Sequence, residues 1–281
     1  MGSIVVVHGV RNWKRQVSPS VAAQSLADSW QLQLTAGYEN AGLRHVEVPQ
    51  ITAAYYGHLI NDTEAQGIDE SAESLSAAEQ SAVLAWLGAT SLPTEPAESQ
   101  SWGGLPLRQT IDLVARRRGI AAKTVSRIAV AFIPEVYRYL ASPTRRAAAQ
   151  QAVADSIEAS GTSVLVAHSL GSIVAYETLH ARPDLPIRVL ITLGSPLGLP
   201  EAVFDILNPA PVGGYGARPP KIAHWTNIAD SGDLVALPRR LGDRFPVDVH
   251  EEAHMAAVDF HTLSTYLSCG LTAAAIAPHC T

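Results

Sequence analysis

The sequence predicts an α/β fold, with a mostly parallel sheet that carries helices on both faces. Short runs rich in β-branched residues alternate with longer segments of helical periodicity. Several of these runs are apolar throughout, as expected for parallel strands that are covered on both sides. The 281 residues are enough for a full core, and 47% hydrophobic with 16% charged residues is a globular composition.

The first three elements are expected to form a β-α-β unit. Residues 3–9 read as a buried strand that ends at Gly9. Residues 19–36 have helical periodicity, with Ser18 as N-cap, Pro19 in the first turn and Gly37 as the stop. Residues 44–56 look extended.

Residues 57–142 interrupt this alternation. A crossover needs only about a dozen residues, so we expect an insertion here. Its residues 61–81 are polar and acidic and 92–104 are loop-like, whereas 106–118 and 122–141 have helical patterns. Long excursions are commonly functional, and we interpret this one as a helical cap beside the site. A helical decoration without a binding role is the alternative. Residues 1–281 then form a single domain that contains the insertion.

The alternation resumes at Ser142, an N-cap before Pro143, and the helix it opens ends before Gly161. The segments that follow alternate regularly. They are strands at 162–168, 187–196, within 221–233 and at 244–250, and helices at 170–181 and 261–277.

Composition excludes several classes of protein. The net charge of −6 argues against nucleic acid as a partner, and the cluster Arg116, Arg117 and Arg118 is better explained as the solvated end of a helix. No apolar run approaches the roughly 18 residues of a membrane span. No signal peptide is visible, and two cysteines are too few for a disulfide framework, so we expect reduced thiols and a cytoplasmic location.

A tight turn from strand to helix is predicted at Ser169. The β-branched run before it and the helix after it leave almost no connecting residues. Such a turn needs small residues two before and two after, and these are Ala167 and Gly171. This is the nucleophile-elbow pattern G-x-S-x-G with Ala in the first position. The N–H of Leu170 would then face a developing oxyanion, and that of Val10, in the loop after the first strand, would be the second donor.

At these motifs the chain resembles the α/β-hydrolase family and, more loosely, its bacterial esterase, lipase and thioesterase branches. The matching segments run in the family's order of serine, acid and histidine. They are VVVHGV (5–10), AHSLGS (167–172), LITLGSPLG (190–198), NIADSGDLVALP (227–238) and HTLSTYL (261–267). Alanine at 167 departs from the commonest form of the motif, and residues 57–142 match nothing specific.

A serine nucleophile needs a base, and the base needs an orienting carboxylate. Asp233 follows a predicted strand and resembles the acid position of many lipases, with Asp230 as runner-up. His261 opens the last helix and resembles the family's base, with His254 next. His8 and His168 are expected to pack or hydrogen-bond locally.

A second motif, HEEAH at 250–254, fits the zinc pattern H-E-x-x-H. That pattern requires both histidines on one face of a helix. The residues before His250 alternate as in a strand, so we expect a loop here and no metal.

The resemblance and these residues together imply a serine hydrolase that cleaves an ester or thioester through an acyl-enzyme, without a cofactor. The Pro- and Gly-rich segment 195–220 and the insertion suggest a covered cleft for a lipophilic small-molecule substrate. An acyltransferase or cyclising thioesterase would use the same residues. A non-catalytic binding protein on the same fold is the alternative from another class.

Overall fold

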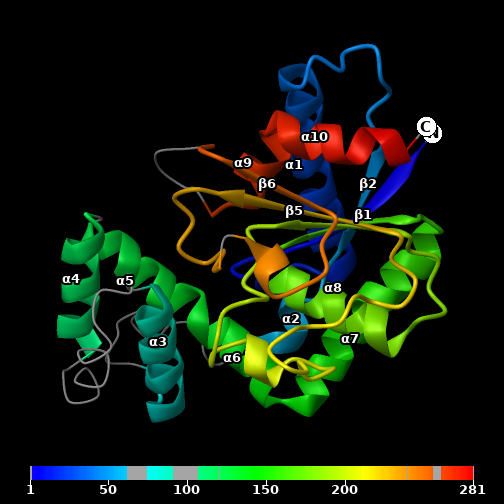
Figure 1. Ribbon diagram of the computed structural model, residues 1–281. Coiled ribbons are helices and arrows are strands. Elements are labelled where there is room, and N and C mark those ends of the chain that lie inside the picture. The colour runs from blue at the N-terminus through cyan, green and yellow to red at the C-terminus, as the bar shows by residue number, and fades with distance from the viewer. Residues whose placement is uncertain are drawn as a thin grey trace.

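The computed structural model describes residues 2–61, 75–90, 107–119, 121–238, 240–255 and 261–280. Its centre is one six-stranded sheet in which every neighbouring pair is parallel (Figure 1). The strand order is β2-β1-β3-β4-β5-β6. The strands are β1 (Ser3–Val7), β2 (Gln50–Ala54), β3 (Val164–His168), β4 (Val189–Leu193), β5 (His224–Asp230) and β6 (Val249–Ala253). The predicted α/β class is therefore confirmed.

Alternate residues of the central strands enter two separate cores. In β1, Val5 and Val7 belong to one core cluster, whereas Ile4 and Val6 belong to the other. Both sets are completely buried. A strand covered on both faces has no solvent side, which explains why its sequence is apolar without alternation.

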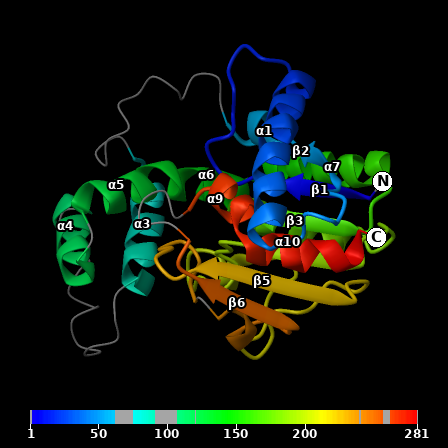
Figure 2. The same cartoon turned by 90° about the horizontal axis from the view of Figure 1, so that it is seen from above.

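Helices cover both faces of the sheet, as expected (Figures 1 and 2). One layer consists of α1 (Pro19–Asn40), α9 (Leu263–Ser268) and α10 (Gly270–Ile276). The other contains α2 (Gly57–Ile60), α7 (Pro143–Ser160) and α8 (Leu170–Ala181). The predicted caps are present, since the side chains of Ser18 and Ser142 accept hydrogen bonds from Val21 N–H and Arg145 N–H.

Two predicted helix boundaries are wrong, because the glycines Gly37 and Gly270 allow close packing between helices. Gly37 does not stop α1; it lies inside the helix, where a Cβ would collide with the backbone carbonyl of Leu267. The closing helix is two helices, because Cys269 is extended and Gly270 packs against the backbone of Ala41.

The last strand lies later in the chain than predicted. Residues 244–248 are not part of it; β6 shares only Val249 and His250 with the predicted strand and continues into acidic residues. The alternation that suggested a strand at 244–250 has two other causes. Phe245 is buried in the core, and the carboxylate of Asp248 accepts a hydrogen bond from Trp225 N–H. Charged residues on an edge strand such as β6 discourage further pairing.

The insertion is helical where it is described. Besides α2, which belongs to the layer on the sheet, its described part contains α3 (Ala77–Thr90), α4 (Leu107–Arg118), α5 (Ala122–Ala131) and α6 (Ile133–Ala141). The sequence did not predict α3, and the single pattern over 122–141 is two helices that meet at Phe132, just before Pro134. Residues 92–104 and most of 61–81 lie outside the described residues. In Figure 2, α3, α4 and α5 lie on the side to which the arrows of β5 and β6 point.

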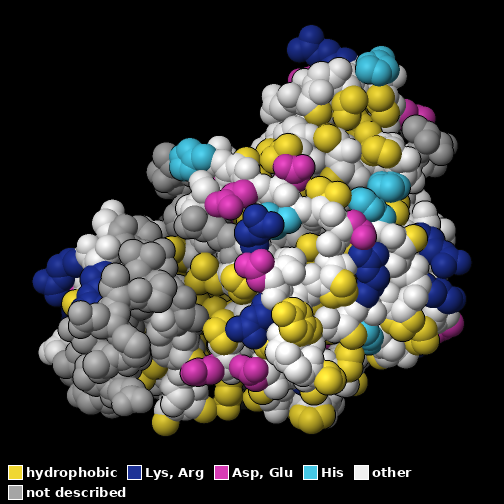
Figure 3. All heavy atoms as spheres, viewed as in Figure 1, with side chains coloured by type: hydrophobic (Ala, Val, Ile, Leu, Met, Phe, Trp, Pro, Cys, Tyr) yellow, Lys and Arg dark blue, Asp and Glu magenta, His cyan; other side chains and the backbone are white. Residues whose placement is uncertain are grey.

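Arg116 and Arg117, at the end of α4, are exposed. On the face in Figure 3, acidic and basic side chains are interspersed. Within the described ranges no helix is both long and apolar enough to cross a bilayer. Cys269 and Cys280 are both free thiols.

Candidate active site

Ser169 occupies a strained turn between β3 and α8. Its φ of 56° and ψ of −130° lie outside the regions that L-residues commonly adopt. The turn is held by its own backbone: Ser169 N–H donates to Leu193 O at 3.0 Å, and Ser169 O accepts from Ser172 Oγ at 2.6 Å. The tight turn predicted from sequence is therefore present.

Glycines on both sides let the backbone close around Ser169. A Cβ on Gly171 would fall on the carbonyl oxygens of Val7 and His8, so only glycine lets α8 approach β1 this closely. A Cβ on Gly9 would lie 3.0 Å from Ser169 Oγ. The loop after β1 thus packs directly against the serine hydroxyl.

Asp233 lies in the loop after β5 and is almost completely buried. Its Oδ1 accepts hydrogen bonds from Val235 N–H at 2.8 Å and Ala236 N–H at 3.3 Å. These two bonds fix the carboxylate and aim its other oxygen, Oδ2, at His261.

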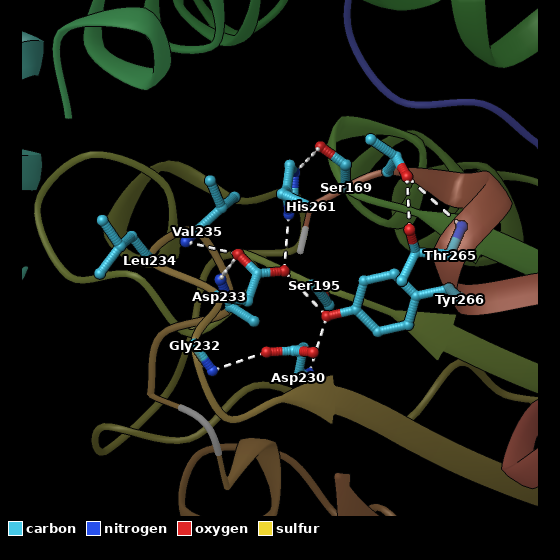
Figure 4. Close-up of polar contacts among 12 residues, drawn as sticks. Ser169, Ser195, Asp230, Gly232, Asp233, Leu234, Val235, His261, Thr265 and Tyr266 are labelled. Atoms are coloured by element: carbon cyan, nitrogen blue, oxygen red, sulfur yellow. Dashed lines mark hydrogen bonds and ion pairs between the residues drawn. The ribbon is translucent and has the colours of Figure 1, made fainter. Parts of the chain in front are cut away.

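His261 joins the aspartate and the serine, which are 64 residues apart in the sequence (233 − 169) (Figure 4). Its Nδ1 lies 2.6 Å from Asp233 Oδ2, and its Nε2 lies 2.8 Å from Ser169 Oγ. With a proton on Nδ1 donated to the carboxylate, Nε2 is free to accept the proton of the hydroxyl. Ser169 has no exposed surface, and the imidazole of His261 keeps 13%.

Two neighbouring histidines stay neutral. The His168 ring lies 4.9 Å from that of His261, between centroids, and burial holds its pKa well below the usual value. Burial also lowers the pKa of His8 to about 4. His8 Nδ1 donates to Gly9 O, and its Nε2 accepts from Tyr56 N–H. Both rings pack or bond locally, as expected, and neither places a positive charge beside His261 near pH 7.

Tyr266 supports the carboxylate of Asp233 from α9. Its hydroxyl donates to Asp233 Oδ2 at 2.8 Å and accepts from Asp230 N–H at 2.9 Å. Burial and the adjacent carboxylate raise the pKa of Tyr266 well above its usual value, so the phenol stays protonated. Tyr266 lies in the segment HTLSTYL (261–267) that resembles the α/β-hydrolase family, but the sequence alone predicted no role for it.

The two predicted oxyanion donors are the N–H groups of Leu170, which follows Ser169 in the chain, and of Val10, in the loop after β1. Leu170 is the first residue of α8, where N–H groups have no partner within the helix. Val10 follows Gly9 in the loop that packs on Ser169. Within the described part of the chain, neither N–H donates a hydrogen bond.

The runner-up residues lie elsewhere. Asp230 is completely buried, but its side chain accepts from Gly232 N–H and Met255 N–H, each at 2.6 Å. His254 is exposed, and its Nδ1 lies 3.5 Å from Ser231 Oγ. The structure therefore brings Asp233 and His261 to Ser169, and directs Asp230 and His254 to other partners.

The segment that fits the zinc pattern, residues 250–254, does not have the geometry of that pattern. Residues 250–253 belong to β6, so the loop expected here is wrong, and His250 and His254 are not on successive turns of a helix. His250 Nδ1 instead lies 3.1 Å from Asn227 Nδ2.

The insertion contacts the site at three points that the sequence did not predict. Phe132 meets the ring of His261 edge-on, with centroids 5.7 Å apart. Trp86 Nε1 of α3 donates to Leu234 O, next to Asp233. Glu135 of α6 accepts from Arg11 N–H, in the loop after β1. Each is a contact between elements far apart in sequence, and no local pattern marks it.

Comparison of the chain with protein-family models, curated proteins and solved structures finds no match.

Proposed function

We propose that this protein is a serine hydrolase of the α/β-hydrolase type that cleaves an ester or thioester through an acyl-enzyme. The observation that carries the proposal is the continuous hydrogen-bond chain Ser169–His261–Asp233, with contacts of 2.8 and 2.6 Å. Aspartate, imidazole and hydroxyl in this order are the arrangement that makes serine nucleophilic. The position of Ser169 in a strained turn after a central parallel strand also supports it.

Each residue then has a defined task. His261 Nε2 removes the proton from Ser169 as Oγ attacks the acyl carbonyl, and Asp233 stabilises the imidazolium that forms. The N–H groups of Leu170 and Val10 stabilise the oxyanion, and each such donor is typically worth about 3 kcal/mol of barrier. His261 returns the proton to the leaving alcohol or thiol. Water, activated by the same imidazole, then releases the acid and frees Ser169.

The substrate is proposed to be a lipophilic acyl ester or thioester bound beneath the insertion, which acts as a cap. The burial of Ser169 supports a covered site, because a substrate reaches Oγ only if covering residues move. The contacts of Phe132 and Trp86 support a cap that borders both the base and the acid. The free thiols of Cys269 and Cys280 are compatible with the proposed cytoplasmic location.

A fluorophosphonate probe and a series of p-nitrophenyl esters test the proposal. We expect the wild type to be labelled and to hydrolyse at least one ester, indifferent to a chelator. Ser169→Ala should lose both properties. Ser231→Ala and His254→Ala are matched controls, because these residues lie outside the hydrogen-bond chain Ser169–His261–Asp233. Both variants should keep labelling and turnover.

Two outcomes would contradict the proposal: labelling and turnover that survive in Ser169→Ala, or a wild type that neither reacts with the probe nor turns over any ester. In the productive case, varying acyl length identifies the preferred chain. Adding an alcohol or amine acceptor distinguishes acyl transfer from hydrolysis by its product.

A further inference from the structure

The loop after β1 is tied to the insertion by one buried carboxylate. Arg11 N–H donates to Glu135 Oε2 at 2.8 Å, across 124 residues of sequence. Glu135 lies in the first turn of α6 and is 5% exposed. Its other oxygen, Oε1, accepts from Asn61 Nδ2 at 3.1 Å, and Arg138 orients Asn61 by donating to its Oδ1 at 2.9 Å. The carboxylate therefore has one oxygen committed to the loop and one to the insertion.

The other polar groups of this loop are also fixed. Asn12 Nδ2 donates to both Gly9 O and Val10 O, each at 3.0 Å. Arg11 has a φ of 63°, an uncommon value for a residue with a side chain. The carbonyl of Val10 thus faces Asn12 and the next N–H faces Glu135. The N–H of Val10 itself has no acceptor in the described chain, and the loop that carries it packs on Ser169.

We propose that Glu135 is a positioning residue that fixes the oxyanion-binding loop by holding the Arg11 N–H, so that the Val10 N–H points to the reacting carbonyl. This inference rests on the proposed function. Glu135 acts through the loop and touches no reacting atom. The oxyanion site is then complete only when α6 is packed in its observed position, because the hydrogen bond from Arg11 N–H to Glu135 forms only there.

A carboxylate is costly at this position, which argues that its bonds matter. Burial raises the pKa of Glu135, while the Arg11 N–H, Asn61 and the charge of Arg138 oppose that rise. An uncharged side chain would avoid the desolvation of the charge. It would also give up the strong, charge-assisted bond to a backbone N–H that a carboxylate forms.

Glu177 of α8 provides a matched control. It is also a buried carboxylate, 1% exposed, and it is bound by Arg146, by Tyr139 OH and by Asn208 N–H. No hydrogen bond or ion pair of its side chain in the described structure involves the loop after β1, Asp233 or His261. Loss of either carboxylate leaves buried donors unsatisfied, but only Glu135 bears on the proposed oxyanion site.

The test compares Glu135→Ala, Glu135→Gln and Glu177→Gln on the best p-nitrophenyl ester. All are assayed at a temperature where circular dichroism shows them folded. For Glu135→Ala we expect kcat to fall about 10- to 100-fold with KM nearly unchanged, because an oxyanion donor acts in the transition state. Binding of a trifluoromethyl ketone, whose serine adduct carries an oxyanion, should weaken by the same factor. Glu135→Gln keeps one acceptor for the Arg11 N–H and should recover part of both losses.

Glu177→Gln should lower the melting temperature and leave kcat and ketone binding within about 3-fold. The inference fails if Glu135→Ala retains kcat, if it changes KM alone, or if its kcat falls no further than that of Glu177→Gln. If Glu135→Ala does not fold, the same comparison between Glu135→Gln and Glu177→Gln decides. Activity that persists in Ser169→Ala overturns the proposed function itself. Full activity in Glu135→Ala with an inactive Ser169→Ala overturns only the role of Glu135.

Discussion

The turn after β3 and the loop after β5 carry the two ends of the hydrogen-bond chain, but they are held in different ways. The turn at Ser169 has hydrogen bonds to its backbone groups, but its shape depends on close packing, in which Gly171 and Gly9 let β1, β3 and α8 meet without side chains between them. The loop at Asp233 is fixed by hydrogen bonds, from its own amides and from Tyr266 of α9. Steric closure requires particular small residues at fixed spacing, whereas hydrogen bonding accepts donors from anywhere in the chain.

Asp233→Asn, in the loop after β5, should have the largest effect on activity. We expect kcat of the proposed hydrolysis to fall on the order of 10³- to 10⁴-fold, because a neutral amide neither stabilises the imidazolium nor keeps His261 in the required tautomer. The neighbouring Asp230→Asn is the control and should stay within about 3-fold, since its partners are the amides of Gly232 and Met255. Steady-state kinetics measure both, and the opposite ranking would transfer the acid role to Asp230.

Gly171→Ala should disrupt the packing of the turn at Ser169. The new Cβ meets backbone carbonyls of Val7 and His8, which have little freedom to move, so β1 and α8 must separate. We expect a loss of about 3 kcal/mol in the free energy of unfolding, measured in urea, together with lower activity. Gly88→Ala in α3, where a Cβ meets nothing within 4 Å, should be neutral or stabilising. Equal stabilities for the two variants would contradict the packing argument.

Folding stability should depend on pH through His8, which lies in the loop after β1 near the turn at Ser169. His8 has a pKa of about 4 in the folded chain and an ordinary value of 6.5 when unfolded. Between these values the unfolded chain binds more protons, so folding stability falls as pH decreases through this window. The contribution of His8 between pH 7 and pH 5 is about 2 kcal/mol.

Urea unfolding at pH 7 and pH 5 tests this. His8→Gln, which keeps an acceptor for Tyr56 N–H, should lose about 2 kcal/mol less than the wild type over this interval. The pKa of His168 is also lowered, but its contribution to the pH dependence of stability is the same in the wild type and in His8→Gln. Identical pH dependence in the two proteins would show that His8 is not protonated on unfolding.

Tyr266→Phe should have the smallest effect, because it removes only one of the hydrogen bonds that hold the loop at Asp233. Asp233 Oδ2 keeps its contact with His261 but loses the phenol, and Asp230 N–H loses its acceptor. We expect kcat to fall about 10-fold, close to the value of one hydrogen bond to a charged group. Tyr38→Phe in the same core is the control, because the Tyr38 hydroxyl has no hydrogen-bond partner among the described residues. An unchanged kcat in Tyr266→Phe would show that the backbone amides alone hold Asp233.

Ser169 illustrates what a short stretch of sequence can predict. The strand, the turn and the helix around it are contiguous, so the strained turn follows from neighbouring residues and from the small size of Ala167 and Gly171. The β6 strand illustrates the opposite case. Residues 244–250 alternate like a strand, but Phe245 packs in the core, and the edge strand begins only at Val249 and runs on through the acidic residues Glu251 and Glu252.

Residue patterns along the chain were enough to predict the parallel α/β sheet, the helices on both faces and the turn at Ser169, because each depends on local periodicity and local sterics. It narrowed the partners of Ser169 to Asp230 or Asp233 and His254 or His261. The folded chain places Asp233 and His261, and not Asp230 and His254, in the hydrogen-bond chain to Ser169, and it adds the contacts of Tyr266 and Glu135. Those contacts are hydrogen bonds between elements that lie far apart in the chain, and they form where the fold brings donors to buried acceptors, not where any repeating pattern places them.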